Sequence, residues 1–244
     1  MRYDAFKRFI QRFIQRGALV PRFPLTRTLG PLGVTAAAAK WYLAGGISAS
    51  ACVGAYQAKG AASLAASYTN LANPGSHDLT LGTAPAWDAT NGWKGGSSAY
   101  LKTDITPTGA AGTWSAAVRF SNGGGGYECL LGCWSAGATN RFGFQLANYA
   151  GKVEISNYSL KNWIHTKTSG AFVIAGTALY VDGALDPLVL GGGSSPGVPV
   201  YILALNNNGS PSSYTTSYIQ ALALYNTTLS AAQVAAVTTA MNAL

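Results

Sequence analysis

Residues 171–183 read Ala-Phe-Val-Ile-Ala-Gly-Thr-Ala-Leu-Tyr-Val-Asp-Gly, and this stretch decides the fold class. Two short apolar runs, rich in β-branched and aromatic side chains, flank the dipeptide Gly176-Thr177. A two-residue link that contains glycine, placed between two such runs, is typical of a β-hairpin. Asp182-Gly183 then supplies the next turn. The stretch therefore predicts two antiparallel strands, 171–175 and 178–181, joined by a tight turn.

The same pattern of short strands continues on both sides of this hairpin, from about residue 98 onward. Alternating apolar residues predict one buried face in each of three further strands: Trp114, Ala116, Val118 and Phe120; Phe142, Phe144 and Leu146; Val153 and Ile155. Residues 200–205 and 218–225 are nearly continuous apolar runs, as expected for central strands. Glycine- and asparagine-rich turns separate the runs at 123–126, 191–193 and 206–209. This arrangement predicts an all-β, two-sheet antiparallel jelly-roll sandwich.

Helices are expected only toward the two ends of the chain. Ser230 and Gln233 form a capping-box pattern, followed by an apolar stripe of Val234, Val237, Met241 and Leu244, which predicts a short C-terminal helix. Residues 35–67 are rich in Ala, Gly and Ser and show neither helical nor strand periodicity. There we expect a short helix near 36–43 and irregular chain after it.

Several segments resemble the laminin-G-like, concanavalin A-like jelly-roll domains. Residues 179–183 resemble the Leu-Tyr-Val-Asp-Gly strand and turn of that family, and residues 223–234 resemble its closing strand and helix. Residues 114–120 resemble the strand that opens the core of these domains after a segment like 100–103. The resemblance covers about residues 75–244 and implies two sheets packed face to face. Domains of this kind are found in bacteriophage virion proteins and bacterial surface proteins, and the fold carries many different functions.

The first 34 residues fall outside this resemblance and form a basic arm ahead of a domain at 35–244. Residues 1–30 hold seven bases and one acid, in a chain whose formal net charge is +8. A helical stripe in the arm is apolar, and its flanks are basic: Phe6, Phe9, Ile10, Phe13 and Ile14 lie on the stripe, with Arg8, Arg12 and Arg16 beside it. Three interpretations stay open: an anchor in a partner's groove, a helix folded back on its own domain, and a membrane-surface helix.

Residues for catalysis or metal binding are scarce. The chain has eight acidic residues, and no two of them are separated by a single residue. The E-x-D-x-E strand that glycanases of this fold share is therefore absent. His77 and His165 have no partner at zinc-ligand spacing, and no G-x-S-x-G elbow is present. The resemblance to laminin-G-like domains, which often bind calcium through an Asp at the sandwich rim, makes Asp88 and Asp104 candidates for a calcium site, but such a site needs several oxygens. We therefore expect no enzyme activity, no metal and no cofactor.

The three cysteines, Cys52, Cys129 and Cys133, are expected to be small buried hydrophobic residues, although Cys129 and Cys133 are spaced to pair across a tight turn. No signal-peptide pattern opens the chain, and no apolar run has the roughly 20 residues needed to span a bilayer.

A carbohydrate site would combine aromatic faces with amides near loops. The candidates of these types are Trp134, Tyr149, Trp163, Asn207 and Tyr214. The alternative is that these aromatic side chains pack in the core or between subunits.

The leading functional hypothesis is a non-enzymatic virion structural protein, such as a phage capsid decoration protein at the virion surface, docked on capsid proteins through the arm. Charged residues make up only 10% of the chain, which suits a homo-oligomer or a dense assembly. The alternatives are a carbohydrate-binding adhesin or lectin that recognises a host surface glycan, and a peripheral membrane protein, which we favour least. Specific nucleic-acid binding is not expected, because the excess positive charge belongs to the arm.

Overall fold

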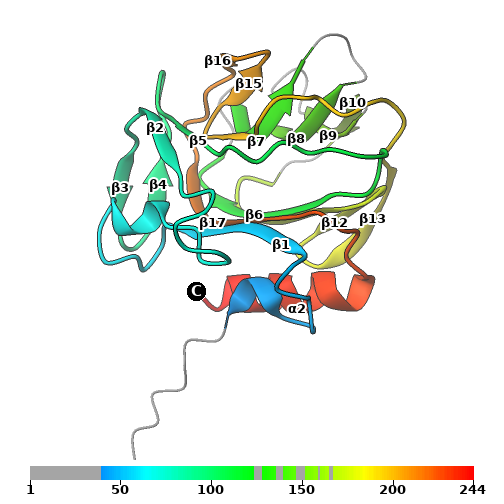
Figure 1. The fold of residues 1–244 in the computed structure, drawn as a ribbon, viewed down its shortest axis with the longest axis horizontal. Helices are drawn as coiled ribbons and strands as arrows, with labels where there is room; N and C mark the ends of the chain where they lie inside the picture. The colour runs from blue at the N-terminus through cyan, green and yellow to red at the C-terminus, as the bar shows by residue number, and fades with distance from the viewer. Residues whose placement is uncertain (1–39, 124–127, 136–139, 147–151, 159, 165–166) are drawn as a thin grey trace, which may run out of the picture. The chain divides into compact units, whose positions relative to one another are not determined.

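The computed structural model describes residues 40–123, 128–135, 140–146, 152–158, 160–164 and 167–244. These residues form two antiparallel sheets packed face to face (Figure 1), which confirms the predicted all-β sandwich. The arm at 1–34 and its candidate residues, including Phe6, Arg8 and Phe13, lie outside the described residues. None of the described helices is long and apolar enough to cross a membrane.

Sheet I is eight-stranded in the described residues. Its strand order is β13 (Ala184–Val189), β12 (Ala178–Val181), β11 (Gly170–Ala175), β6 (Ser115–Ser121), β17 (Tyr218–Tyr225), β4 (Gly92–Lys94) and β3 (Ala86–Asp88), and β1 (Cys52–Gln57) also pairs with β17. The hairpin β11–β12 has the predicted register, with Ala175 opposite Ala178. Asp182, with φ 49°, occupies the next turn.

Sheet II is nine-stranded in the same part of the chain. Its order is β10 (Leu160–Ile164), β9 (Lys152–Asn157), β8 (Arg141–Leu146), β7 (Glu128–Trp134), β14 (Tyr201–Ile202), β5 (Tyr100–Lys102) and β2 (Thr80–Thr83), with a small hairpin of β15 (Leu205–Asn207) and β16 (Ser210–Ser212) beside β7. Two 3-10 turns, η1 (Trp41–Leu43) and η2 (Ala66–Tyr68), and one helix, α2 (Ala231–Asn242), complete the described elements.

The main core lies between the sheets and contains the residues that alternation predicted. Val118 and Phe120 of β6 meet Phe142 and Phe144 of β8 there, and all four side chains are almost completely buried. The Phe120 and Phe172 rings have centroids 4.8 Å apart. Burial of each such side chain stabilises the fold by roughly 1.5–3 kcal/mol, so this alternating pattern accounts for how the two sheets are held together.

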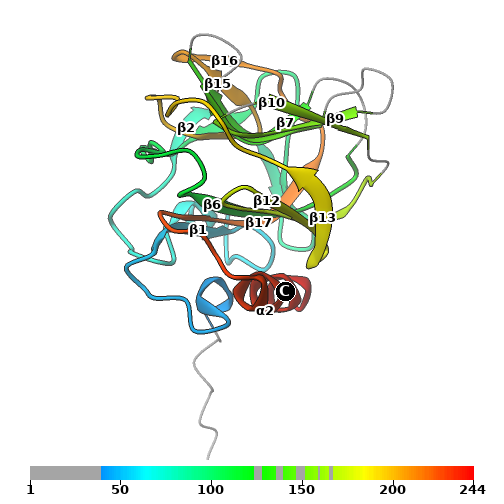
Figure 2. The same ribbon diagram turned by 90° about the vertical axis from the view of Figure 1, so that its right-hand side faces the viewer.

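Helix α2 covers the outer face of sheet I (Figure 2) and builds a second core there. Its predicted capping box is present: the Gln233 backbone N–H donates to Ser230 Oγ, and the Ser230 backbone N–H donates to Gln233 Oε1. At the other end, Arg119 of β6 donates to the Met241 and Leu244 carbonyl oxygens. A cation there complements the negative end of the helix dipole, so both ends of α2 are fastened to specific groups.

Strand β1 corrects the expectation that residues after 43 are irregular. Cys52–Gln57 pairs with β17, with Ala55 opposite Ala223. Its polar–apolar alternation is absent because both of its faces are covered: Tyr56 faces the main core, and Ala55 faces the α2 side. The predicted helix at 36–43 is also reduced, in the described residues, to the turn Trp41–Leu43. Strands β2, β3 and β4 likewise precede residue 98.

The apolar run 200–205 is not one strand. Leu203 has φ 68°, a conformation that breaks strand pairing, and its carbonyl oxygen accepts from the Thr215 backbone N–H. The chain reverses there, so that β14 runs antiparallel to β7 while β15 runs parallel to it. All six residues are nonetheless buried or nearly so, which is why the run is continuously apolar.

A buried carboxylate ties the two sheets together. Glu128 begins β7 and is only 3% exposed. Its oxygens accept from Thr215 Oγ1 at 2.8 Å, from Ser217 Oγ at 2.9 Å, and from Thr216 Oγ1. These hydroxyls belong to the segment that leads into β17 of sheet I, so Glu128 satisfies three donors at the junction of the sheets.

The three cysteines are buried thiols, as expected for small hydrophobic residues, and no disulfide joins Cys129 to Cys133. Burial raises the pKa of Cys52 to about 12 and also raises that of Cys133. Because the thiolate is the reactive form, we expect native protein at neutral pH to show no fast reaction with an aromatic disulfide reagent, and three thiols to react after denaturation in urea. Labelling of even one thiol in the native state would contradict this arrangement.

Candidate ligand pocket

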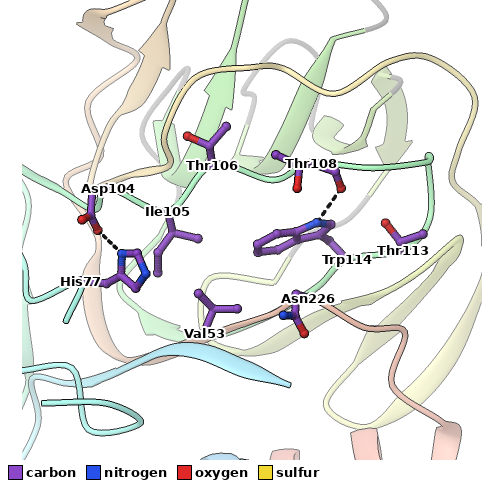
Figure 3. A pocket seen from close by; sticks show the side chains of 9 residues that line it. All are labelled: Val53, His77, Asp104, Ile105, Thr106, Thr108, Thr113, Trp114 and Asn226. Carbon is purple, nitrogen blue, oxygen red and sulfur yellow. Dashed lines mark hydrogen bonds and ion pairs between the residues drawn. The ribbon is translucent and has the colours of Figure 1, made fainter. Parts of the chain in front are cut away.

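A pocket of about 480 Å³ opens between the sheets at one rim of the sandwich. Both sheets contribute to its wall (Figure 3). Val53 comes from β1 and Asn226 follows β17, both of sheet I, whereas Asp104 and Thr106 follow β5 of sheet II. Because strands of both sheets end here, the pocket is lined by groups that are far apart in the sequence.

The inner wall of the pocket is apolar. The indole of Trp114 points into it, and Ile105 and Val53 lie to the left of the indole in the view of Figure 3. Trp114 is held in place because its Nε1–H donates to the Thr108 carbonyl oxygen at 2.8 Å. Trp114 lies at the edge of the main core and is 6% exposed, so the same side chain serves packing and lines the pocket.

The outer wall is polar and uncharged on the Trp114 side. Thr106, Thr108, Thr113 and Asn226 line it. The Asn226 backbone N–H donates to the Ala51 carbonyl oxygen at 3.0 Å, which fixes the residue while its side chain stays exposed. Hydroxyl and amide groups of this kind both donate and accept hydrogen bonds, so this wall suits a ligand that does the same.

A histidine–aspartate pair lies at the opposite side of the pocket. His77 Nδ1 lies 2.5 Å from Asp104 Oδ1 (Figure 3). Their side chains are 34% and 70% exposed, respectively. In the neutral tautomer that carries its proton on Nδ1, toward Asp104, the other ring nitrogen of His77 is an acceptor. In the described residues no hydroxyl group is hydrogen-bonded to His77, and the pair adds hydrogen-bonding groups to the pocket wall.

His77 is held in an uncommon backbone conformation, with φ 59°. Tyr56 Oη donates to its carbonyl oxygen at 2.6 Å. The neighbouring Asp78 accepts from the Asn70 backbone N–H at 2.7 Å, and the buried Asn70 side chain donates to the Val53 and Ser76 carbonyl oxygens at 2.9 Å each. These hydrogen bonds fix the position of His77 at the pocket.

The residues predicted to bind glycans lie elsewhere, and none of those described lines the pocket. Trp134 of β7 and Asn207 of β15 are register partners. The Arg141 guanidinium lies 3.9 Å from the centroid of the Trp134 ring, so one indole face is occupied. Tyr214 lies near Tyr100, with ring centroids 6.3 Å apart. Tyr149 lies outside the described residues, as does the side chain of Trp163 in β10.

Sequence reasoning missed the pocket because its residues have ordinary local roles. His77 lies in a bend beside Asp78, and its partner Asp104 is 27 positions away in the sequence. Asp88, the other calcium candidate, accepts hydrogen bonds from its own turn at Thr90 and Asn91, which lower its pKa. No cluster of potential metal ligands occurs in the part of the chain that the structure describes. His165 lies outside that part.

No protein-family model matches this sequence, and no curated protein matches it. The fold is similar to that of Trypanosoma rangeli sialidase, with a TM-score of 0.52 and 15% identity over 79% of this chain and 33% of the sialidase. The same sialidase in complex with sialic acid gives a TM-score of 0.51 and 17% identity, over 79% of this chain and 33% of the sialidase. The receptor-binding domain of botulinum neurotoxin C/D mosaic serotype gives a TM-score of 0.52 and 10% identity, over 79% of this chain and 52% of the toxin domain.

This chain therefore spans about a third of the sialidases and about half of the toxin domain. At these identities the likeness concerns the fold alone.

Proposed function

We propose that this protein is a carbohydrate-binding module and that the pocket at the sandwich rim is its binding site. The observation that supports this most directly is the composition of the pocket, which sets the Trp114 indole and two aliphatic side chains against Asn226, three threonines and the His77–Asp104 pair. A sugar ring has apolar C–H faces and a girdle of hydroxyls. A concave site with an apolar wall and a few convergent polar groups is the type that binds such small ligands.

The similar solved structures are compatible with this proposal, but the proposal rests on the pocket and not on them. One of them is a sialidase solved with sialic acid, and another is a domain named for receptor binding. The proposal assigns binding without turnover, although the sialidases are enzymes, because His77 lacks a bonded nucleophile in the described residues and the chain is poor in acids.

The charge of the pocket favours neutral sugars. Its described lining residues include no Lys or Arg, and Asp104 places a carboxylate on its rim. An anionic sugar would meet this negative charge without a cationic partner, which disfavours its binding. We therefore expect uncharged mono- or oligosaccharides to be preferred over sialylated ones.

The virion hypothesis receives less support. It depends on the arm at 1–34, which lies outside the described residues, and the similar solved structures show no link to bacteriophages. Docking of the arm on capsid proteins at a virion surface stays a prediction, and it is compatible with a glycan-binding domain carried by the same chain.

The test is a glycan array on the full chain, followed by titration of a binding sugar against pocket variants. Asn226→Ala and Asp104→Ala each remove an exposed polar group, so we expect the fold to survive and Kd to rise about tenfold, corresponding to the loss of roughly one hydrogen bond. Trp134→Ala is the matched control, because Trp134 does not line the pocket, and this variant is expected to leave Kd unchanged.

Two outcomes would contradict the proposal in different ways. If the wild-type chain binds no glycan on the array, the proposal that this protein binds carbohydrate is wrong. Binding that is lost in Trp134→Ala but kept in both pocket variants would keep the function and move the site to the surface of Trp134 and Asn207.

A further inference from the structure

The pocket at the sandwich rim has an apolar floor and a polar mouth (Figure 3). We call Val53, Ile105 and Trp114 the floor. Ile105 and Trp114 are only 2% and 6% exposed, and Val53 is partly buried. Four of the polar lining residues are exposed, and these are Asp104, Thr108, Thr113 and Asn226. A ligand that enters the pocket therefore meets hydrogen-bonding groups at the mouth and hydrocarbon at the floor.

Polar groups of the floor residues are already bonded within the protein. The indole N–H of Trp114 and the carbonyl oxygen of Val53 have the partners described above. The Ile105 backbone N–H donates to Thr103 Oγ1 at 3.2 Å, and the Ile105 carbonyl oxygen accepts from the Val200 backbone N–H at 2.9 Å. A ligand hydroxyl placed at the floor would lose its hydrogen bonds to water and find no free group among these, which is unfavourable. The part of a ligand that reaches the floor is therefore apolar.

Trp114 does not offer the broad surface on which a whole sugar ring stacks. A stacking platform exposes one face of an aromatic ring, whereas Trp114 is almost completely buried at the edge of the main core. The other two floor side chains are aliphatic. A small apolar group fits such a floor better than the C–H face of a sugar ring does. In a neutral sugar that group is a methyl, carried either by an acetamido substituent or by C5 of a 6-deoxy sugar.

We propose that the pocket selects neutral sugars that carry a methyl group and that this methyl lies on the floor, an inference that rests on the carbohydrate-binding function proposed above. N-acetylated and 6-deoxy sugars share this chemistry. Their hydroxyls, and the amide of the first class, face the mouth, where Asn226 and the threonines both donate and accept hydrogen bonds. One carbon more or less in an apolar pocket changes affinity by about 10- to 200-fold, so the methyl is sufficient for selection.

The experiment compares sugars that differ only at the methyl group, by saturation-transfer NMR titration of the full chain. N-acetylglucosamine and N-acetylgalactosamine are each paired with the N-formyl sugar, in which a hydrogen replaces the methyl. L-Fucose and L-rhamnose are paired with L-galactose and L-mannose, in which C6 carries a hydroxyl. We expect the methyl-bearing member of at least one pair to bind about tenfold more tightly. The pair that shows this preference distinguishes the acetamido class from the 6-deoxy class.

Two pocket variants separate the floor from the mouth. Val53→Thr keeps the shape of a partly buried side chain in strand β1, where threonine is well tolerated, but adds a hydroxyl to the floor. We expect it to reduce the preference for the methyl to about twofold or less. Asn226→Ala removes a polar group from the mouth and is expected to weaken both members of a pair equally, which leaves the preference at about tenfold.

A second readout uses the wild type alone and does not depend on how well any variant folds. In the bound sugar, the methyl protons should receive more saturation from the protein than the ring protons, because the methyl lies against three apolar side chains. The strongest saturation on ring protons would contradict this placement.

Equal binding of both members of every pair that binds would overturn the inference and leave glycan binding in place. So would a glycan array on which the bound sugars carry no methyl group, or a preference that is lost in Asn226→Ala but kept in Val53→Thr. An array with no bound glycan, together with no binding of the paired sugars, would instead overturn the proposed function and this inference with it.

Discussion

Replacing Val237 with aspartate is expected to lower the free energy of unfolding by roughly 4 kcal/mol, the range found when an unpaired charge is placed in a packed core. Val237 is fully buried between α2 and sheet I. Its neighbours in that cluster include the side chains of Tyr180, Tyr225 and Met241. The Arg119 guanidinium on the same side of sheet I already donates to the Met241 and Leu244 carbonyl oxygens. The variant should show its loss as a lower midpoint in urea unfolding, followed by circular dichroism.

The matched control places the same charge on the exposed side of the same helix. Ala232→Asp lies in the first turn of α2 and is exposed. An acid near a helix N-terminus interacts favourably with the helix dipole, so this variant should unfold within about 0.5 kcal/mol of wild type. Equal stability of Val237→Asp and wild type would mean that α2 does not pack on sheet I.

Replacing Glu128 with alanine is expected to lower the free energy of unfolding by about 3 kcal/mol, because it leaves two buried hydroxyl donors without an acceptor. Thr215 and Ser217, which donate to this carboxylate, are both fully buried. Glu128→Gln retains one acceptor oxygen and should lose less. Both values come from urea unfolding monitored by tryptophan fluorescence.

A double-mutant cycle separates this network from simple packing. Glu128→Ala and Thr215→Val remove the two ends of one hydrogen bond. If the bond contributes as described, the combined variant loses at least 0.5 kcal/mol less than the sum of the single losses, which is the coupling seen between contacting groups. Strictly additive losses would show that the carboxylate and this hydroxyl do not stabilise each other.

Some elements were predictable because the information that forms them is local. The β11–β12 hairpin follows from a glycine-containing link between two apolar runs, and the α2 N-terminus follows from Ser230 and Gln233. The core faces of β6 and β8 follow from alternation, because one side of each strand is buried and the other is not. In contrast, β1 escaped prediction because both of its faces are covered, so its apolar residues do not alternate with polar ones.

The candidate site also combines a feature that local sequence predicts with features that depend on residues distant in the chain. Alternation predicted that Trp114 is apolar and faces inward. Alternation identifies the buried face of a strand, but it does not show that a pocket lies beside Trp114 at the rim of the sandwich. The proposed glycan residues were chosen by type and nearness to loops, and these criteria brought together Trp134 and Asn207 but missed the pocket.

The sequence by itself determined that this protein is an all-β sandwich closed by a capped helix, because hairpins, alternation and caps depend on residues within a few positions of one another. Only the tertiary structure decided that Leu203 breaks an apolar run, that Glu128 bonds hydroxyls some 88 positions away, and that His77 meets Asp104 opposite Trp114. The physical reason is that buried polar groups and pockets are set by which strands become neighbours, and residues distant in the chain supply their partners.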